Sequence, residues 1–411
     1  MGKNFFFKIN FSNPVLIYLL IWLTTLYIYN LELTKNIKGL NEKTSLLIYS
    51  SCIIFLILYF ILVLIRHELK KNKFDIKIKI QNINNDFVIL KFKKVIKLIF
   101  KIWLFFSVLE ILIFKGVPLI SVVLLRQTDL DYAKFGIPTV HGLLNALFYT
   151  FLSGYFILYN LTKKKEYLFF AFIFLLWPIL LMSRASLLWA ISEILCIHLL
   201  FNKITFKKIS KIILYVLLFI YLFGVLGDAR IGEDSTFKAS NFINTKYESY
   251  EKYIPSGFIW VYLYATTPIN NLVSQTEQIN PSYNFRSTTE GLIPSFIRTK
   301  IYSEDEKYGF ELEDSAFNVS SYFTNYLNDF GINGSILFVS ILMILILLIY
   351  NNCTSGKIGS IIAYSAVFYA ILTSIFFNNF LSLVTVFQVI LGYYINNFLY
   401  KNKKLNYNVQ K

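Results

Sequence analysis

Arginine is scarce in this chain, and its positions are the first indication of chemistry. Only six of the forty basic residues are arginine. A guanidinium group stays charged and presents a planar fork of N–H donors, which suits a diphosphate or a carboxylate. All of the arginines except Arg66 fall on the outer side of the membrane topology that the lysine pattern predicts. We expect these five to bind a substrate diphosphate: Arg126, Arg184, Arg230, Arg286 and Arg298.

Group transfer from a diphosphate to a hydroxyl also needs a base near the acceptor. Four carboxylates on the predicted outer side are candidates for this catalytic role: Glu233, Asp234, Glu290 and Asp314. His141 is a further candidate base, and Asp129 and Asp131 form an Asp-x-Asp pattern beside Arg126 that could hold a metal. Because arginines can stabilise the departing diphosphate by themselves, we expect neither a metal nor another cofactor.

The elements that must position these residues are membrane helices. The chain has 411 residues, is 56% hydrophobic and has a mean hydropathy of +0.56. Its apolar runs are long enough to cross a hydrocarbon layer of about 30 Å. We predict an all-α polytopic membrane protein with ten transmembrane helices, over 14–30, 45–65, 96–114, 140–160, 167–182, 184–201, 210–227, 330–350, 358–377 and 380–400.

Positive charge sets the orientation of these helices, because short loops rich in lysine and arginine stay in the cytoplasm. Such loops follow the second, fourth and sixth predicted helices, and basic residues also follow the tenth, as in Lys163-Lys-Lys165 and Lys401-Asn-Lys-Lys404. Both termini are therefore predicted to be cytoplasmic. The basic excess faces anionic lipid and does not indicate nucleic-acid binding.

The predicted topology divides the chain into three parts. Residues 1–227 form a membrane domain with a basic cytoplasmic hairpin at 70–94, because 75–81 alternate with period two and 87–93 follow a turn-rich segment. Residues 228–329 form one large outer loop domain, with fourteen acidic and eight basic residues and hence a balance of −6. Residues 330–411 complete the membrane domain. Glu193, within a predicted helix, is expected to make structural hydrogen bonds.

Several short motifs then resemble a known family. They are Gly116-Val-Pro118, the Arg126 loop that ends in Phe135-Gly-Ile-Pro138, the Ser183-Arg184 turn, and an Asn-rich run that ends in Asp329-Phe-Gly-Ile-Asn-Gly334. Over about 100–340 the chain resembles the O-antigen polymerase family of oligosaccharide repeat-unit polymerases. The resemblance implies a C-type glycosyltransferase architecture in the bacterial inner membrane. It also implies that repeat units carried on undecaprenyl diphosphate are joined at the outer leaflet, with a chain-length regulator protein as a further partner.

Two other functions stay open. An O-antigen ligase, or another lipid-linked sugar transferase, has a similar layout, but the ligase family uses a histidine in its large outer loop. The three histidines here are His67, His141 and His198, and none lies in 228–329. A lipid-linked oligosaccharide flippase would need paired polar-lined helical repeats, and a large outer loop is not expected there.

The charge pattern makes the orientation testable. A reporter that is active only outside the cytoplasm should be active when it is fused after residue 270 and silent when it is fused after residue 355, because these positions lie in the outer domain and in a cytoplasmic loop. The reverse pattern would invalidate the placement of the five arginines on the outer side.

Overall fold

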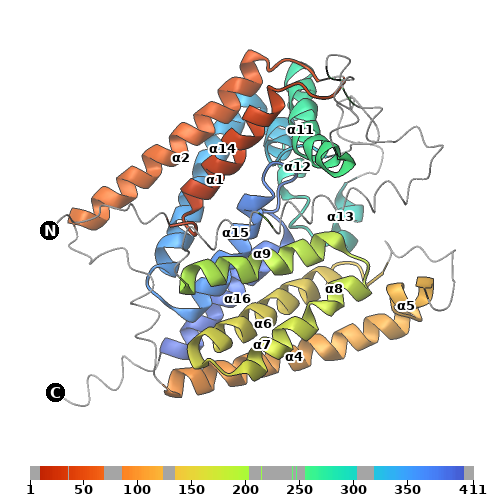
Figure 1. Cartoon of the computed structure of the whole chain (residues 1–411), viewed down its shortest axis with the longest axis vertical. Coiled ribbons are helices and arrows are strands. Elements are labelled where there is room, and N and C mark those ends of the chain that lie inside the picture. The colour runs from red at the N-terminus through yellow and green to blue at the C-terminus, as the bar shows by residue number, and fades with distance from the viewer. Residues whose placement is uncertain are drawn as a thin grey trace.

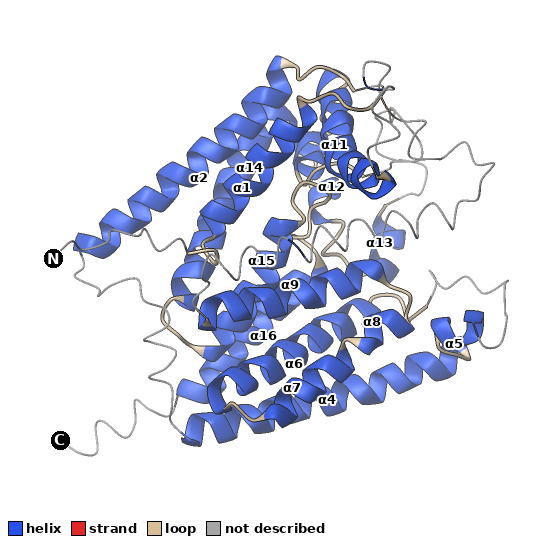
Figure 2. Cartoon of the chain, viewed as in Figure 1, coloured by secondary structure: helices blue, strands red, loops and turns tan. Residues whose placement is uncertain are grey.

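The computed structural model describes residues 10–35, 37–68, 86–123, 135–202, 255–302 and 319–401, with the single residues 214, 243 and 247. The described part of the chain is all-helical, and its one extended pairing is an isolated bridge between Thr34 and Ile243 (Figure 2). The helices form one bundle. In Figure 1, the short helices α5 (Pro118–Val123), α12 (Arg286–Thr289) and α13 (Ser295–Ile301) lie toward one side, opposite the end where α4 (Asp86–Phe114) begins.

One half of the bundle consists of α1 (Pro14–Tyr29), α2 (Glu42–Glu68), α14 (Phe323–Cys353) and α11 (Ser256–Glu277). Its core is aromatic, with Trp22, Phe55 and Tyr322 almost fully buried. The Tyr18 hydroxyl lies 2.8 Å from the hydroxyls of both Ser51 and Tyr322, so these polar groups are satisfied within the apolar core.

The other half contains the remaining long helices. They are α4, α6 (Val140–Thr162), α7 (Lys165–Phe174), α9 (Arg184–Phe201), α15 (Ile358–Leu372) and α16 (Leu383–Tyr400), with the short α8 (Leu176–Leu180) between α7 and α9. Helix α15 packs against α14 as well as α9 and α16, so it joins the two halves. All of its residues from Ile358 to Ile371 are buried. A helix that is buried on every side is apolar around its whole circumference, as the sequence of α15 is.

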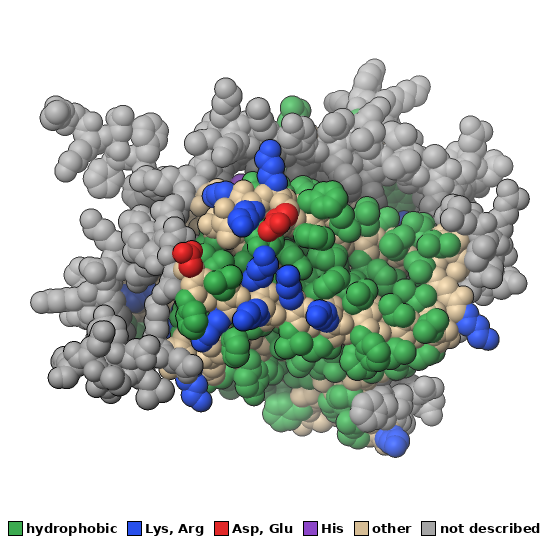
Figure 3. Space-filling model, turned by 90° about the horizontal axis from the view of Figure 1, so that it is seen from below, with side chains coloured by type: hydrophobic (Ala, Val, Ile, Leu, Met, Phe, Trp, Pro, Cys, Tyr) green, Lys and Arg blue, Asp and Glu red, His purple; other side chains and the backbone are tan. Residues whose placement is uncertain are grey.

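Five described helices are long and apolar enough to cross a membrane, namely α2, α6, α9, α14 and α16, while α1 and α15 are apolar but shorter. These helices indicate a membrane protein. The face formed by α4 and α7 has the matching surface: Figure 3 shows apolar side chains over most of it and a group of basic side chains to one side. Exposed lysines on α4, Lys94, Lys97 and Lys101, contribute basic charge there, and long lysine side chains can reach the polar membrane surface.

One sequence prediction about local structure is wrong, and one predicted span is not a single continuous helix. The predicted span 167–182 is divided between α7 and α8, because the α7 helix stops at Phe174 and Pro178 follows. Residues 87–93 are not a hairpin strand but the first turns of α4, since Val88, Phe92 and Ile96 recur at helical spacing and are buried. The first strand of that hairpin, 75–81, lies outside the described residues, as does nearly all of the predicted span 210–227.

The buried Glu193 joins four helices at the centre of this half, as expected for a structural hydrogen-bonding group. Its carboxylate accepts hydrogen bonds from the side chains of Ser153 in α6 (2.5 Å), Trp189 in α9 (2.9 Å), Ser365 in α15 (3.2 Å) and Gln388 in α16 (2.8 Å). A carboxylate is costly inside an apolar bundle unless donors surround it, and here they do.

The contact between α15 and α16 depends on two glycines. A Cβ at Gly359 would overlap the carbonyl oxygen of Gly392, and a Cβ at Gly392 would overlap that of Gly359.

We expect Gly359→Ala to destabilise the protein by about 1–3 kcal/mol through overpacking. The melting temperature of the detergent-purified protein measures this effect. Gly39→Ala is the matched control, because no atom lies within 4 Å of the added Cβ at Gly39; equal losses in the two variants would contradict the packing argument.

Candidate functional site

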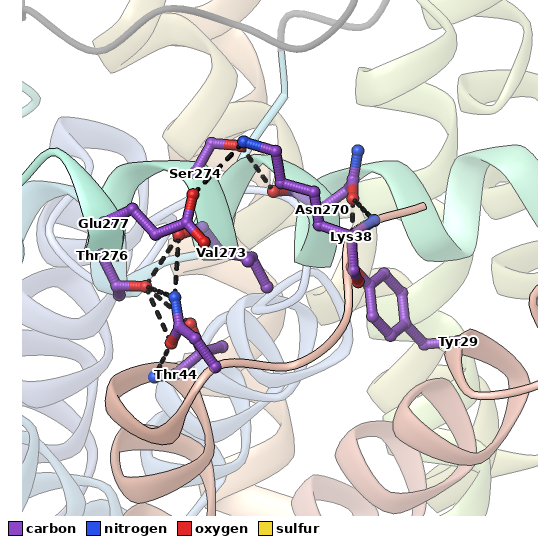
Figure 4. A network of polar contacts seen from close by, with 9 residues as sticks. Tyr29, Lys38, Thr44, Asn270, Val273, Ser274, Thr276 and Glu277 are labelled. Atoms are coloured by element: carbon purple, nitrogen blue, oxygen red, sulfur yellow. Dashed lines mark hydrogen bonds and ion pairs between the residues drawn. The ribbon is translucent and has the colours of Figure 1, made fainter. Parts of the chain in front are cut away.

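Helix α11 forms the frame for the arginine-bearing segments. Although it belongs to the predicted outer loop domain, it packs against α1, α2 and α14. Figure 4 shows how polar contacts fix it to the connection between α1 and α2: Tyr29 Oη and the Lys38 backbone N–H both donate to Asn270 Oδ1, at 3.0 and 2.8 Å. Nearby, the Thr44 and Thr276 hydroxyls lie 2.7 Å apart. Burial raises the pKa of Tyr262 to about 12, so its hydroxyl stays protonated while accepting from Leu33 N–H at 2.9 Å.

A second set of contacts, made by Asn271 and Gln275 of α11, holds the start of α14. Gln275 Nε2 donates to the Asn328 side-chain oxygen at 2.7 Å and to the Thr324 carbonyl at 3.2 Å. Asn271 Nδ2 donates to the Val319 carbonyl at 2.8 Å. Residues 270 to 276 are all buried, and amides and hydroxyls inside a bundle need such partners. The result is a helix whose polar residues determine where α14 begins.

A buried carboxylate on α14 then holds the short helix α12. Asp329, which is 1% exposed, accepts hydrogen bonds from the backbone N–H groups of Ser287 (3.0 Å) and Thr288 (2.7 Å). Asn325 Nδ2 donates to the Ser287 carbonyl at 2.7 Å. Gly331, two residues after Asp329, has φ 65 and ψ −165 and interrupts the helix, a conformation that favours glycine. The triplet Asp329-Phe-Gly331 is therefore an anchor for the segment that begins with Arg286.

Two of the predicted arginines lie on this anchored segment. The Arg286 guanidinium carbon lies 4.8 Å from the centroid of the Tyr302 ring, which links α12 to the end of α13. Arg298 Nη1 on α13 lies 3.5 Å from Glu290 Oε1, and both side chains are partly exposed. Glu290, a predicted base, is thus the ion-pair partner of a predicted diphosphate ligand. This pairing makes Glu290 better suited to orienting Arg298 than to accepting a proton.

The segment after α12 also touches the start of α16, and through it the start of α6. Leu383 N–H donates to the Gly291 carbonyl at 2.8 Å, and a Cβ at Gly291 would lie 2.8 Å from the Leu381 carbonyl oxygen. Leu383 also lies near Gly142 of α6: a Cβ added at Gly142 would be 3.5 Å from Leu383 Cδ2. Gly142 follows His141, so Leu383 contacts both the segment after α12 and the residue next to the predicted base His141.

His141 has a partner that sequence reasoning missed. Its Nδ1 lies 3.0 Å from Oε2 of Glu110, a residue near the end of α4 whose side chain is 1% exposed. The other carboxylate oxygen of Glu110 accepts a hydrogen bond from Ile137 N–H at 3.0 Å. A single acid in the apolar run 102–114 was itself a signal, because a charged group at that depth needs a partner, and His141 opens the next predicted helix.

Several buried side-chain oxygens on α11, on α12 and around the start of α14 have no protein partner among the described residues. Within the described residues, five buried side-chain oxygens in this region accept no hydrogen bond: Gln275 Oε1, Thr288 Oγ1, Ser320 Oγ, Ser321 Oγ and Thr324 Oγ1. They lie on α11, on α12 and at the start of α14. Buried oxygens of this kind can bind water or the hydroxyl groups of a ligand.

The remaining predicted site residues are not brought into this arrangement. Arg184 is exposed at the first position of α9, after Ser183, whose hydroxyl caps the helix by accepting from Ser186 N–H at 3.3 Å. Seven predicted site residues lie outside the described residues: Arg126, Asp129, Asp131, Arg230, Glu233, Asp234 and Asp314. Among the described residues, no three His, Cys, Asp or Glu side chains form a group that could hold a metal ion.

Comparison with known proteins adds no relative: no protein-family model, curated protein or solved structure matches this chain. The functional argument therefore depends on the residues and their geometry.

The role of Asp329 predicts a specific loss of stability. In Asp329→Asn, one carboxylate oxygen becomes an NH₂ group that faces a backbone N–H, so a buried donor loses its acceptor. We expect a cost of about 1–3 kcal/mol, seen as a lower melting temperature of the purified protein. Glu166→Gln at the exposed start of α7 makes the same chemical change without a buried carboxylate. If both variants melted like the wild type, Asp329 would not anchor α12.

Proposed function

We propose that this protein polymerises oligosaccharide repeat units carried on undecaprenyl diphosphate, at the outer leaflet of the bacterial inner membrane. In this proposal the chain crosses the membrane ten times, both termini are cytoplasmic, and 228–329 is the outer domain. One observation carries the proposal: the buried Asp329 holds α12, which begins with Arg286, and the segment that follows pairs Glu290 with Arg298.

This arrangement suits a lipid-linked sugar substrate. A fork of N–H donors held in position can stabilise the negative charge that grows on a departing diphosphate. Rigid placement is essential for this effect, and the two backbone hydrogen bonds of Asp329 provide it.

The geometry also gives physical roles to motifs that support the family resemblance. In the Asn-rich run, Asn325 and Asn328 bind Ser287 and Gln275, and Asp329 binds the backbone of α12. The Phe135-Gly-Ile-Pro138 motif folds over Glu110 through Ile137 N–H. The start of α16 at Leu383 contacts both Gly291, next to Glu290, and Gly142, next to His141, and in this proposal the substrate binds at this contact.

The proposal predicts that arginine geometry matters more than charge. Lysine at Arg286, Arg298, Arg184 or Arg230 keeps the charge but loses the fork, so each variant should impair polymerisation. Losing one aimed donor at an electrostatic site costs about 100- to 1,000-fold in rate. The readout is glycan chain length on gels of a deletion strain complemented with each variant, with protein level checked by blot.

Arg66→Lys is the control on the opposite side of the bundle, and it should make full-length glycan. Arg66 Nη2 donates to the Asn351 carbonyl (3.3 Å) and the Thr354 hydroxyl (2.7 Å). Because lysine loses these structural bonds, the melting temperature of Arg66→Lys is measured as well, and its glycan is compared with that of variants of equal melting temperature. Full-length glycan from all four outer lysine variants would remove the arginines from the site.

A second prediction separates guanidinium binding from metal binding. If arginines alone hold the diphosphate, isolated membranes should keep polymerising in a strong chelator, and Asp129→Asn and Asp131→Asn should have mild effects. Loss of polymer in chelator, restored by manganese or magnesium, would favour the acidic pair instead.

A further inference from the structure

We infer that Glu110 and His141 form the acid–base pair of the transfer reaction, with His141 taking the proton from the acceptor hydroxyl and Glu110 positioning the imidazole. This assignment rests on the proposed function. It replaces a base among the outer-loop carboxylates with a pair that joins the end of α4 to the start of α6.

The hydrogen bonds fix the orientation of the imidazole. Because an ionised carboxylate can only accept hydrogen bonds, the 3.0 Å contact between Glu110 Oε2 and His141 Nδ1 has Nδ1–H as its donor in the state in which Glu110 is ionised. Nε2 is then left with its lone pair, as a general base requires. Glu110 cannot turn away easily, because its second oxygen accepts from Ile137 N–H at 3.0 Å.

The connecting turn closes on the ring from the other side. Phe135 meets the imidazole edge-on, with ring centroids 5.7 Å apart. Gly136 has φ 101, and a Cβ there would lie 2.6 Å from His141 Cγ, so only glycine lets the turn come this close. The His141 side chain nevertheless remains 29% exposed, whereas that of Glu110 is 1% exposed. A buried carboxylate behind a reachable imidazole is the arrangement of an oriented base.

The location connects the pair to the diphosphate-binding segment. Gly142 and Gly291 both approach Leu383, the first residue of α16, from α6 and from the segment after α12. His141 precedes Gly142, and Glu290, the partner of Arg298, precedes Gly291. A base on one side and arginines on the other are what a transfer between two bound sugars needs.

The step balances without an oxidant or a metal. His141 Nε2 takes the hydroxyl proton of the acceptor sugar, and the acceptor oxygen bonds to the anomeric carbon of the donor. The bond between that carbon and the diphosphate oxygen breaks, and its electron pair leaves with the lipid diphosphate. The arginines stabilise the leaving group, and the imidazolium, paired with Glu110, later loses its proton to water.

Variants of the pair test the assignment in membranes of the complemented deletion strain, which contain the native lipid-linked repeat units. His141→Gln should slow polymer formation by about 100-fold or more, within the range of general-base catalysis. His198→Gln, at the far end of α9, is the matched control and should polymerise normally. Because each variant of the pair changes a contact of a buried carboxylate, its melting temperature should fall, and rates are compared per folded protein at a temperature below the melting transition of each variant.

Glu110→Gln tests positioning through the split between kcat and KM. Glutamine keeps the size of the side chain but loses the charge that holds the imidazole in place, so kcat should fall while KM for the lipid-linked repeat unit stays at the wild-type value.

Each other outcome is decisive. Normal polymer from folded His141→Gln, or a wild-type kcat in Glu110→Gln, would overturn the assignment and leave the proposed function standing. Wild-type membranes that make no polymer would overturn the proposed function and this assignment together.

Discussion

The arrangement of the candidate site depends on one buried carboxylate, that of Asp329, which accepts hydrogen bonds from two backbone N–H groups of α12. A four-residue helix such as α12 cannot fix its own position, because it has too few internal hydrogen bonds. Asp329 supplies that position from α14, and α11 supports α14 through Gln275 and Asn271. The polar residues of a long apolar bundle are thus concentrated where they hold Arg286 and its neighbours.

The sequence predicted most of the membrane helices because their apolar runs are long. It placed 184–201 at the bounds of α9 and began 140–160 at the start of α6. It missed α11 as a bundle helix, since buried Asn, Gln, Ser and Thr lower its hydropathy and only tertiary hydrogen bonds explain their burial. It also misread 87–93, where a period-two pattern competed with the helical spacing of Val88, Phe92 and Ile96.

The candidate site was predictable in its residue types and less so in its pairings. Scarcity of arginine identified Arg286 and Arg298, and the motif that contains Asp329 was noticed without a role. The ion pair of Glu290 with Arg298 could not be read from spacing alone, because both residues lie in a loop with many charges. Glu110 lies in an apolar run whose hydropathy predicts only a helix, and its pairing with the candidate base His141 depends on tertiary structure.

The central claim is that this protein extends a glycan on a lipid diphosphate, and deletion of its gene in the native host tests it most directly. Surface glycan from the deletion strain is separated on a gel beside that of the parent strain. The account predicts that the ladder of polymer bands disappears while a single repeat unit stays attached. An unchanged ladder, or a complete absence of attached glycan, would contradict it, and the second result would indicate a ligase or a flippase.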